Sequence, residues 1–444
     1  MAEDRDRTLR PRRQRTHPGR IGLALAGGGF LGAAWELGAL CAITETIEGF
    51  DPTRLDAYVG VSAGSFLAAG LVNGVSPHRM VQLFVEGDAD DETLEPSRLL
   101  RPAYDAWGRA ARIFPGTLAR ALRGVADTGL RRPHAALWLA IEALLRGLPD
   151  GLVDASPAER TLARLFDRDG RTNDFRRTRA PLRIVATDVD SGRPVAFGGP
   201  AHEHVPISRA VIASSAVPGL FPPVRIGSRR YVDGALNKTL HASLALDEGA
   251  GLVFCLNPLV PFDGAGAGTR RVSRSGVGAV LAQTMRATIR SRMSVGLEKY
   301  RVTHPDADVV LFEPPHDDAE VFFANIFSVA SRRRLCEHAY RTTRADLLAR
   351  RGALDPVLRR HGLSIDDRVL RVRTPRLVRE PSRTRNRWVE TRTGLVLHRL
   401  SRTLEDLERA MEIAAARAGE RGTDAADAVD GPGVARALRE AAAA

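Results

Sequence analysis

The chain has 444 residues, of which 44% are hydrophobic, and can form one large domain or two to three ordinary ones with a sizeable core. Its formal net charge of +12 usually indicates an anionic partner, either nucleic acid or a membrane surface. However, Lys238 and Lys299 are the only lysines among many arginines. A compositional bias therefore explains the charge equally well. The scattered Cys41, Cys255 and Cys336 indicate neither a disulfide framework nor a zinc site and fit a reducing compartment.

The first part of the chain reads as a tail followed by two strand–helix units. Residues 1–20 are polar and rich in arginine, which predicts a disordered basic tail. IGLALA at 21–26 is a short apolar run before glycines, as expected of a buried parallel strand, and residues 30–46 have apolar side chains near helical spacing. DAYVGVSAGSFLAAGLV at 56–72 repeats the pattern. Residues 57–78 lack Asp, Glu, Lys and Arg, but their glycines and serines predict a strand, a turn and a buried helix rather than a membrane span.

The middle of the chain predicts further strands and a helical insertion. Residues 98–150 are rich in arginine and have apolar residues at amphipathic helical spacing, which predicts either a cap or lid or a plain helical layer on the sheet. Strands are expected at 182–190, 194–199, 251–259 and 307–315, with helical stretches such as 207–217 between them. The alternation predicts a three-layer α/β/α domain with a mostly parallel central sheet.

The last hundred residues differ in composition. Residues 346–420 are predicted to form a basic, proline-punctuated linker and a C-terminal helix. This helix has a short heptad pattern formed by Leu397, Leu400, Leu404, Leu407 and Met411. Residues 421–444 are rich in Ala, Gly and Asp and are predicted to be disordered.

The first motif is the glycine loop after the first strand. Gly27, Gly29 and Gly32 have the spacing G-x-G-x-x-G, which is typical of a dinucleotide-binding turn. That use requires an acidic residue at the end of the second strand, where this chain has Gly60-Val61-Ser62, with Asp56 before the strand. The backbone N–H groups of Gly27, Gly28 and Gly29 can instead form an oxyanion hole. A nucleotide-dependent oxidoreductase remains the alternative.

The second motif is GVSAGS at 60–65, which is G-x-S-x-G at a strand-to-helix turn. A nucleophile on such a turn projects its hydroxyl, and bulky residues at Gly60 and Gly64 would clash with the turn. The helix that follows directs the positive end of its dipole at the reaction centre. The motif therefore predicts that Ser62 is a nucleophile.

The third motif supplies a candidate base. RRYVDGALNKTL places Asp233 at the end of a short strand, directly before Gly234 and Ala235. Taken alone, an Asp-Gly pair is most often a turn. Because an aspartate is a weak base, we expect burial of Asp233 to raise its pKa, or the glycine loop to share the work. A triad that contains a histidine is the alternative, with His316 in EPPHDDAE as its best candidate.

The three motifs in this order, with VATDVDSGRPVAF at 185–197 and ASSAVPGLFPPVRIGSRRYVDGALN at 213–237, resemble the patatin-like phospholipase family over about residues 21–345. The resemblance implies a Ser62–Asp233 dyad, an oxyanion loop at Gly27–Gly29, and hydrolysis of an acyl ester in a lipid without a metal or cofactor. Leu31 stands where many bacterial members have Arg or Lys, which puts a preference for anionic head groups in doubt. Ala235 stands where glycine is also common.

The expected partners follow from this resemblance. We expect a lipid substrate and a cytoplasmic protein that is peripheral at the inner face of the membrane, bound through the arginine-rich segments 98–132 and 368–387. A solvated basic face explains these segments equally well. The sequence has no nucleic-acid motif and indicates no oligomeric state. A catalytically inactive, membrane-binding protein of the same fold is the third hypothesis.

Overall fold

The computed structural model describes residues 17–87, 101–128, 150–168, 170–264, 271–324, 329–372 and 376–378. The chain divides into two compact units, residues 1–380 and 381–444, and every described residue belongs to the first. Three predicted features lie outside the described residues: the C-terminal helix with its heptad pattern, the tail at 421–444, and residues 129–149 of the insertion.

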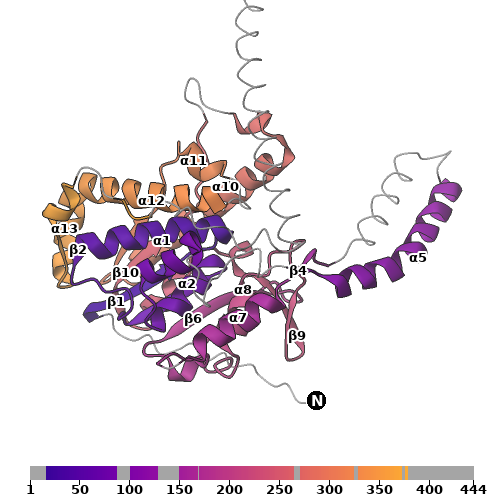
Figure 1. Ribbon diagram of the computed structural model, residues 1–444, viewed down its shortest axis with the longest axis horizontal. Coiled ribbons are helices and arrows are strands. Elements are labelled where there is room, and N and C mark those ends of the chain that lie inside the picture. The colour runs from indigo at the N-terminus through magenta and orange to yellow at the C-terminus, as the bar shows by residue number, and fades with distance from the viewer. Residues whose placement is uncertain are drawn as a thin grey trace, which may run out of the picture. The chain divides into compact units, whose positions relative to one another are not determined.

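The core of the first unit is an eight-stranded sheet with the order β11-β10-β1-β3-β6-β9-β8, in which β7 also pairs with β6 (Figure 1). The five strands from β11 to β6 are parallel, and β7, β8 and β9 are antiparallel to their neighbours. The predicted α/β class with a mostly parallel sheet is therefore confirmed. The strands are β1 (His17–Leu25), β3 (Ala57–Val61), β6 (Leu182–Asp188), β7 (Pro194–Phe197), β8 (Val224–Ile226), β9 (Arg229–Asp233), β10 (Ala250–Leu256) and β11 (Asp308–Phe312).

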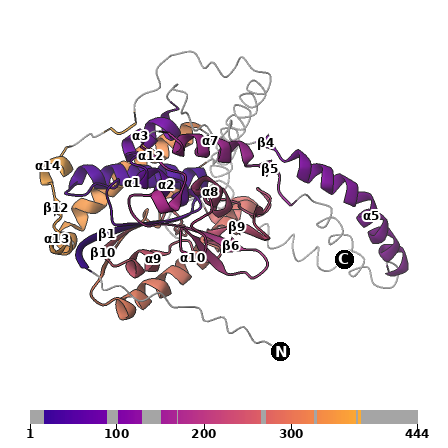
Figure 2. The same ribbon diagram turned by 90° about the horizontal axis from the view of Figure 1, so that it is seen from below.

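Helices cover both faces of this sheet because its central strands are apolar on both sides. Leu23 and Leu25 of β1 belong to the larger hydrophobic cluster, whereas Ala24 between them belongs to the smaller one. This alternation follows from the period of two along a strand. Figure 2 shows α9 (Ala242–Asp247) and α10 (Gly276–Thr303) on the opposite side of the sheet from α1 (Gly29–Thr46) and α12 (Val329–Ala349). The sheet is thus the middle of three layers.

The first two long helices each follow a strand, as the alternation predicts. The larger cluster contains residues of α1 (Gly29–Thr46), α2 (Ala63–Val72), α7 (Ser156–Phe166), α8 (Ile207–Ser214), α12 (Val329–Ala349) and α13 (Arg351–Arg360). The smaller cluster contains residues of α9 (Ala242–Asp247) and α10 (Gly276–Thr303). Short helices are α3 (Pro77–Met80), the π-helix η1 (Val81–Glu86), η2 (Phe175–Arg177), η3 (Gly234–Leu236), η4 (Val272–Arg274), α11 (Ala319–Phe322) and α14 (Asp367–Leu370).

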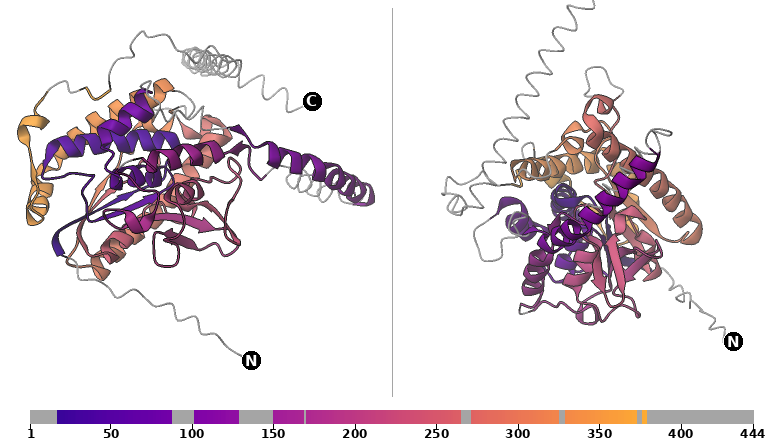
Figure 3. Two further views of the ribbon diagram at one scale, coloured as in Figure 1. Left: turned by 60° about the horizontal axis from the view of Figure 1, so that its bottom comes forward. Right: turned by 90° about the vertical axis from the view of Figure 1, so that its right-hand side faces the viewer.

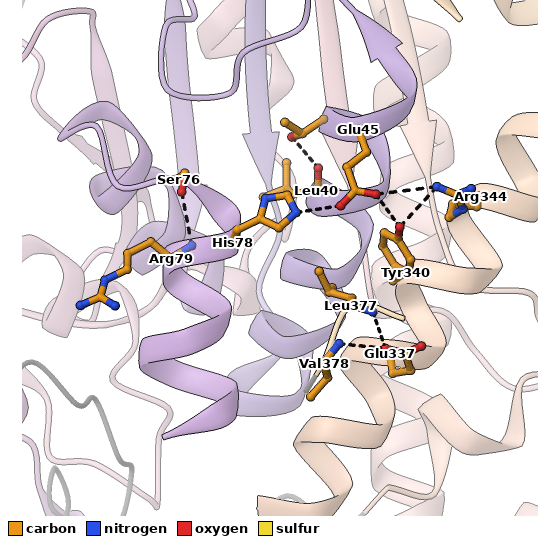
Figure 4. Close-up of polar contacts among 11 residues, drawn as sticks. Leu40, Glu45, Ser76, His78, Arg79, Glu337, Tyr340, Arg344, Leu377 and Val378 are labelled. Carbon is orange, nitrogen blue, oxygen red and sulfur yellow. Dashed lines mark hydrogen bonds and ion pairs between the residues drawn. The ribbon is translucent and has the colours of Figure 1, made fainter. Parts of the chain in front are cut away.

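A polar cluster joins α12 to α1 and α3 (Figure 4). The carboxylate of Glu45 accepts hydrogen bonds from Tyr340 Oη and lies 2.8 Å from His78 Nε2, with Arg344 Nη1 3.7 Å away. Next to it, Glu337 Oε2 accepts the N–H groups of residues 377 and 378 at 2.9 and 3.0 Å. Tyr340 and Arg344 are buried, so these contacts hold α12 and the segment after α14 onto the domain.

The insertion begins at a small ladder. Strand β4 (Arg101–Pro102) pairs with β5 (Val153–Asp154), and α5 (Tyr104–Thr128) starts directly after β4 (Figure 3). The indole Nε1 of Trp107 donates to Leu152 O at 3.3 Å, which ties the first turn of α5 to this ladder. The helical content predicted for this region is present over α5. Its role as a cap or lid stays a prediction.

Three further predictions can be compared with the structure. Residues 17–20 belong to β1 and not to the predicted tail, because backbone pairing of His17 with Ala250 does not require apolar side chains. The domain continues beyond residue 345: β12 (Ser364–Ile365) pairs with β2 (Ile47–Glu48), which follows α1. Among the described residues, no helix combines the length and the apolar character needed to cross a membrane.

Candidate active site

The glycine loop and Ser62 lie at one edge of the sheet because both follow the carboxyl ends of neighbouring parallel strands. β1 ends at Leu25 and β3 at Val61, and the two strands pair with Leu25 opposite Gly60. Ligand sites in open α/β sheets form at this edge. The N–H of Gly64 donates to Ala26 O at 3.0 Å, which fixes the turn against the loop.

Ser62 occupies a strained turn between β3 and α2. Its φ of 52° and ψ of −122° make it the one non-glycine residue with positive φ in the described part of the chain. A Cβ at Gly60 would lie 2.5 Å from Gly64 O, and a Cβ at Gly64 would lie 2.5 Å from Leu25 O. Only glycine fits these positions, as the G-x-S-x-G pattern indicates. Such strain is characteristic of a nucleophile elbow.

Asp233 lies directly beside Ser62. β9 runs antiparallel to β6 and pairs Asp233 with Ala186, while β3 pairs Val61 with Val185 on the other side of β6. The hydroxyl of Ser62 donates to Asp233 Oδ2 at 2.6 Å. The two residues that the sequence singles out separately are therefore in direct contact.

The surroundings of Asp233 favour its neutral form. The residue is 3% exposed, and burial raises the pKa of its carboxyl to about 6. The hydrogen bonds from Ser62 and from the N–H of Ala235, at 2.8 Å to Oδ1, act in the opposite direction. The burial outweighs them, so Asp233 is a stronger base than an ordinary aspartate.

Two further serines position the turn, and sequence reasoning assigned them no role. The N–H of Ser62 donates to Ser214 Oγ at 2.8 Å, and Ser214 Oγ donates in turn to Val185 O at 2.6 Å. Ser65 Oγ donates to Ser62 O at 2.5 Å. Ser65 lies inside the quoted motif, but Ser214 comes from α8, and its contact depends on the packing of that helix against β6.

The three glycines of the loop differ in what their N–H groups do. The N–H of Gly27 donates to Thr239 Oγ1 at 3.2 Å, so this donor is already occupied. The N–H groups of Gly28 and Gly29 have no protein acceptor among the described residues. Gly29 is exposed and starts α1 with φ of 61°, a conformation that suits glycine. Two donors at a helix N-terminus are thus available for an anionic oxygen.

The other motif residues support these two loops. Gly32 donates its N–H to Gly28 O at 2.9 Å, which closes the first turn of α1. Gly234 and Ala235 begin the short helix η3, and a Cβ at Gly27 would lie 3.0 Å from the Cβ of Ala235. The D-G-A segment therefore packs directly on the glycine loop. Thr239, four residues after Ala235, is a further residue that the sequence did not identify.

The dinucleotide alternative lacks its acidic residue at this edge. Asp56 precedes β3 and so lies at the amino end of the strand, where its Oδ2 accepts the N–H of Ile21 at 2.8 Å. The carboxyl end of β3 carries Ser62 instead. An acid that could bind a ribose at this strand end, as a dinucleotide-binding turn requires, is therefore missing among the described residues.

A histidine triad has no support either. His316 is in contact with a backbone oxygen, Pro261 O, at 3.3 Å from its Nδ1. Within the described ranges, no histidine is bonded to Ser62 or Asp233, and no group of three or more His, Cys, Asp or Glu side chains could hold a metal ion. Leu31, the departure from many bacterial members, is buried at 8% exposure.

Comparisons with known proteins give a family match and several similar solved structures. The family model described as patatin-like phospholipase matches residues 23–246. Solved structures that the chain resembles include VipD from Legionella pneumophila (17% identity, TM-score 0.32, 74% of this chain and 66% of that chain covered). A second is the type III effector protein ExoU (17% identity, TM-score 0.33, 91% of this chain and 66% of that chain covered). A third is full-length ExoU in complex with SpcU from Pseudomonas aeruginosa (19% identity, TM-score 0.26, 65% of this chain and 53% of that chain covered).

The chain covers 66% of the length of each of the first two structures, just under two thirds. The family model, by contrast, matches just over half of the chain and includes all three motifs. The chain belongs to the patatin-like phospholipase family.

Proposed function

We propose that the protein is a serine acyl hydrolase that cleaves acyl esters of phospholipids or neutral lipids, with Ser62 as nucleophile and Asp233 as base. The observation that carries this proposal is the 2.6 Å hydrogen bond from the Ser62 hydroxyl to the buried carboxyl of Asp233. A hydroxyl on a strained turn, bonded to a carboxyl with a raised pKa, is suited to nucleophilic attack.

In the first step, Ser62 Oγ attacks the carbonyl carbon of the ester, and its proton passes to Asp233 Oδ2. Because the pKa of Asp233 is about 6, the carboxylate is mostly ionised at neutral pH and still binds a proton more readily than an ordinary aspartate. The carbonyl oxygen becomes an oxyanion. We assign to it the N–H groups of Gly28 and Gly29 at the start of α1, which have no acceptor in the part of the chain that the structure describes.

In the second step, the tetrahedral intermediate collapses and the C–O bond to the leaving alcohol breaks. The alcohol takes the proton from Asp233, and an acyl group remains on Ser62. A water molecule then attacks this acyl-enzyme, gives its proton to Asp233 and releases the fatty acid, and Ser62 regains its proton. This sequence uses no metal ion or cofactor.

The natural substrate and location belong to the same proposal. The family implies a lipid, and we propose a cytoplasmic protein that is peripheral at the membrane. The arginine-rich segments 98–132 and 368–387 are candidate contacts with anionic head groups.

A fluorophosphonate probe tests the nucleophile. The purified chain is treated with the probe, and the modified peptide is identified by mass spectrometry. Turnover of a short-chain ester is measured in parallel. We expect modification of Ser62, and loss of both modification and turnover in Ser62→Ala. Ser294→Ala is the matched control, because Ser294 is an exposed serine of α10.

A wild-type protein that neither reacts with the probe nor cleaves the ester would overturn the proposal in favour of an inactive, membrane-binding protein. Equal labelling of wild type and Ser62→Ala would overturn the assignment of the nucleophile.

A further inference from the structure

The outer face of α10 is apolar and exposed. Val277, Leu281 and Met285 follow one another at intervals of four, which places them on one side of the helix, and they are 76%, 64% and 43% exposed. Val295, which lies five turns after Val277, is 69% exposed. We call the surface formed by these four residues the α10 apolar face. Single exposed apolar residues are common, but four aligned on one helix form a patch.

The second half of α10 orients the helix, because its residues at the same spacing of four beyond Met285 turn toward the domain. Ile289, Met293 and Tyr300 are buried, and the last two belong to the smaller hydrophobic cluster with α9 and the sheet. Lys238 Nζ also donates to Tyr300 Oη at 2.6 Å. The second half of the helix is therefore packed on the domain. Its first half, residues 276–288, contains no buried residue, so the apolar side chains at 277, 281 and 285 are accessible in the part of the chain that the structure describes.

Basic residues predominate around the α10 apolar face. Residues 264–297 include six arginines and no aspartate or glutamate, and the nearest acidic residue after them, Glu298, pairs with Arg301. Arg271 and Arg274, at the start of this segment, are exposed and have no carboxylate partner among the described residues. Arg292, farther along the helix, is also exposed, and its Nη1 donates to Asn237 O at 2.9 Å. An apolar stripe beside unpaired arginines is typical of a helix that lies on an anionic bilayer.

A cavity of about 150 Å³ lies between α10 and the segment 235–240. Its lining includes Met285 of the α10 apolar face and Leu236, which is 44% exposed. The same lining includes Ala235, whose N–H binds Asp233, and Thr239, which accepts the N–H of Gly27. The cavity therefore joins the exposed face of α10 to the two residues that hold the base and the glycine loop.

We propose that the α10 apolar face docks on the surface of a bilayer containing anionic phospholipid, and that the cavity beneath it accepts an apolar segment of the lipid on its way to Ser62. The second half rests on the proposed function, whereas docking does not. The rival occupants are the part of the chain at 381–444 and a second copy. The arginines favour an anionic lipid, because residues 381–444 contain basic as well as acidic side chains.

Vesicle sedimentation tests the docking surface. Vesicles of phosphatidylcholine alone are compared with vesicles of equal parts phosphatidylcholine and phosphatidylglycerol. We expect the wild type to bind the mixed vesicles, and Val277→Asp combined with Leu281→Asp to weaken this binding on the order of tenfold, because two exposed apolar side chains are replaced by charges that the lipid repels. Leu348→Asp is the matched control, since Leu348 is a half-exposed leucine of α12, on the opposite side of the sheet.

Each variant is also assayed on a soluble short-chain ester, and its mass in solution is measured. Unchanged ester turnover shows that the double variant is folded. Binding of the double variant to mixed vesicles as tightly as the wild type would overturn the docking surface. A change in oligomeric mass without a change in vesicle binding would also overturn it, because the face would then bind a second copy. A gain of protease sensitivity in residues 381–444 without a change in vesicle binding would overturn it as well, because the face would then bind that segment.

The two proposals fail separately. If the soluble ester is cleaved and vesicle binding does not depend on α10, the hydrolase stands and the docking surface falls. If vesicle binding depends on α10 and no ester is cleaved, the docking surface stands and the hydrolase falls. Thr288→Trp, at an exposed position that lines the cavity, should lower turnover of a long-chain ester several-fold relative to a short-chain ester. An unchanged ratio would overturn the role of the cavity.

Discussion

Ser62 Oγ and Asp233 Oδ2 are 2.6 Å apart, although the two residues are 171 positions apart in the chain. They meet because β3 and β9 flank the same strand, β6, on its two sides. The elbow that holds Ser62 and the strand end that holds Asp233 are both buried, so neither group can relax into water. The properties of this pair lead to the first two predictions.

The rate of ester hydrolysis should rise with pH through an apparent pKa near 6. Asp233 must be ionised to accept the proton of Ser62, and burial raises its pKa to about 6. The measurement is kcat/KM for a short-chain ester between about pH 4.5 and pH 8, corrected with Ser62→Ala. A profile that is already flat at pH 5 would show that Asp233 titrates as an ordinary aspartate and is not the buried base.

Asp233→Asn should become more stable relative to the wild type as the pH rises. A carboxyl with a raised pKa stabilises the folded state at low pH, and this contribution is lost as the pH rises through the folded value of about 6. The shift of about two pH units corresponds to roughly 3 kcal/mol. The difference in the free energy of unfolding between variant and wild type should therefore grow by up to about 3 kcal/mol from pH 4 to pH 7. Urea unfolding at the two pH values measures it, and a pH-independent difference would contradict it.

Thr239 should act on the rate through the glycine loop. Its Oγ1 accepts the N–H of Gly27, the residue before the two free donors. Thr239→Val removes the acceptor while keeping the shape, and we expect kcat to fall about tenfold with little change in KM, because an oxyanion contact acts in the transition state. Thr239→Ser keeps the hydroxyl and should retain most of the rate. Equal losses in both variants would indicate a packing effect instead.

Glu45 should contribute to stability rather than to catalysis. Burial alone would raise its pKa, but the hydrogen bonds from His78 and Tyr340, together with the charge of Arg344, lower it (Figure 4). Glu45→Gln leaves the buried Arg344 without its carboxylate and should reduce the free energy of unfolding by about 2 kcal/mol at pH 7.

A lowered carboxyl pKa stabilises the fold above the ordinary value, and the stabilisation is lost as the pH falls through the lowered one. The loss in Glu45→Gln should therefore shrink below about pH 4. Glu298→Gln is the control, because the Glu298–Arg301 pair is exposed and should be worth little. Thermal unfolding of both variants at pH 7 and below about pH 4 measures the two losses of stability. An equal effect of the two substitutions would contradict the prediction.

Much of the candidate site could be read from local sequence. Gly60, Gly64 and the strained Ser62 follow from the steric needs of one turn, and a short apolar strand precedes that turn. The same holds for the glycine loop after β1. The strand–helix alternation, which depends on residues close in sequence, predicted the α/β layers. The boundary of β1 was missed by a few residues because its polar start pairs through the backbone alone.

Other features arise only when distant segments pack. The sequence could not show that Gly27 gives its N–H to Thr239, 212 positions away, or that Ser214 holds the backbone of Ser62.

The sequence by itself determined that a nucleophile turn, a glycine loop and an Asp-Gly turn exist, because each depends on the backbone freedom of a few adjacent residues. Tertiary structure alone decided which N–H groups stay free, how deeply Asp233 is buried and which side of α10 is exposed. Each of these depends on contacts between residues that only the packing of helices on the sheet brings together.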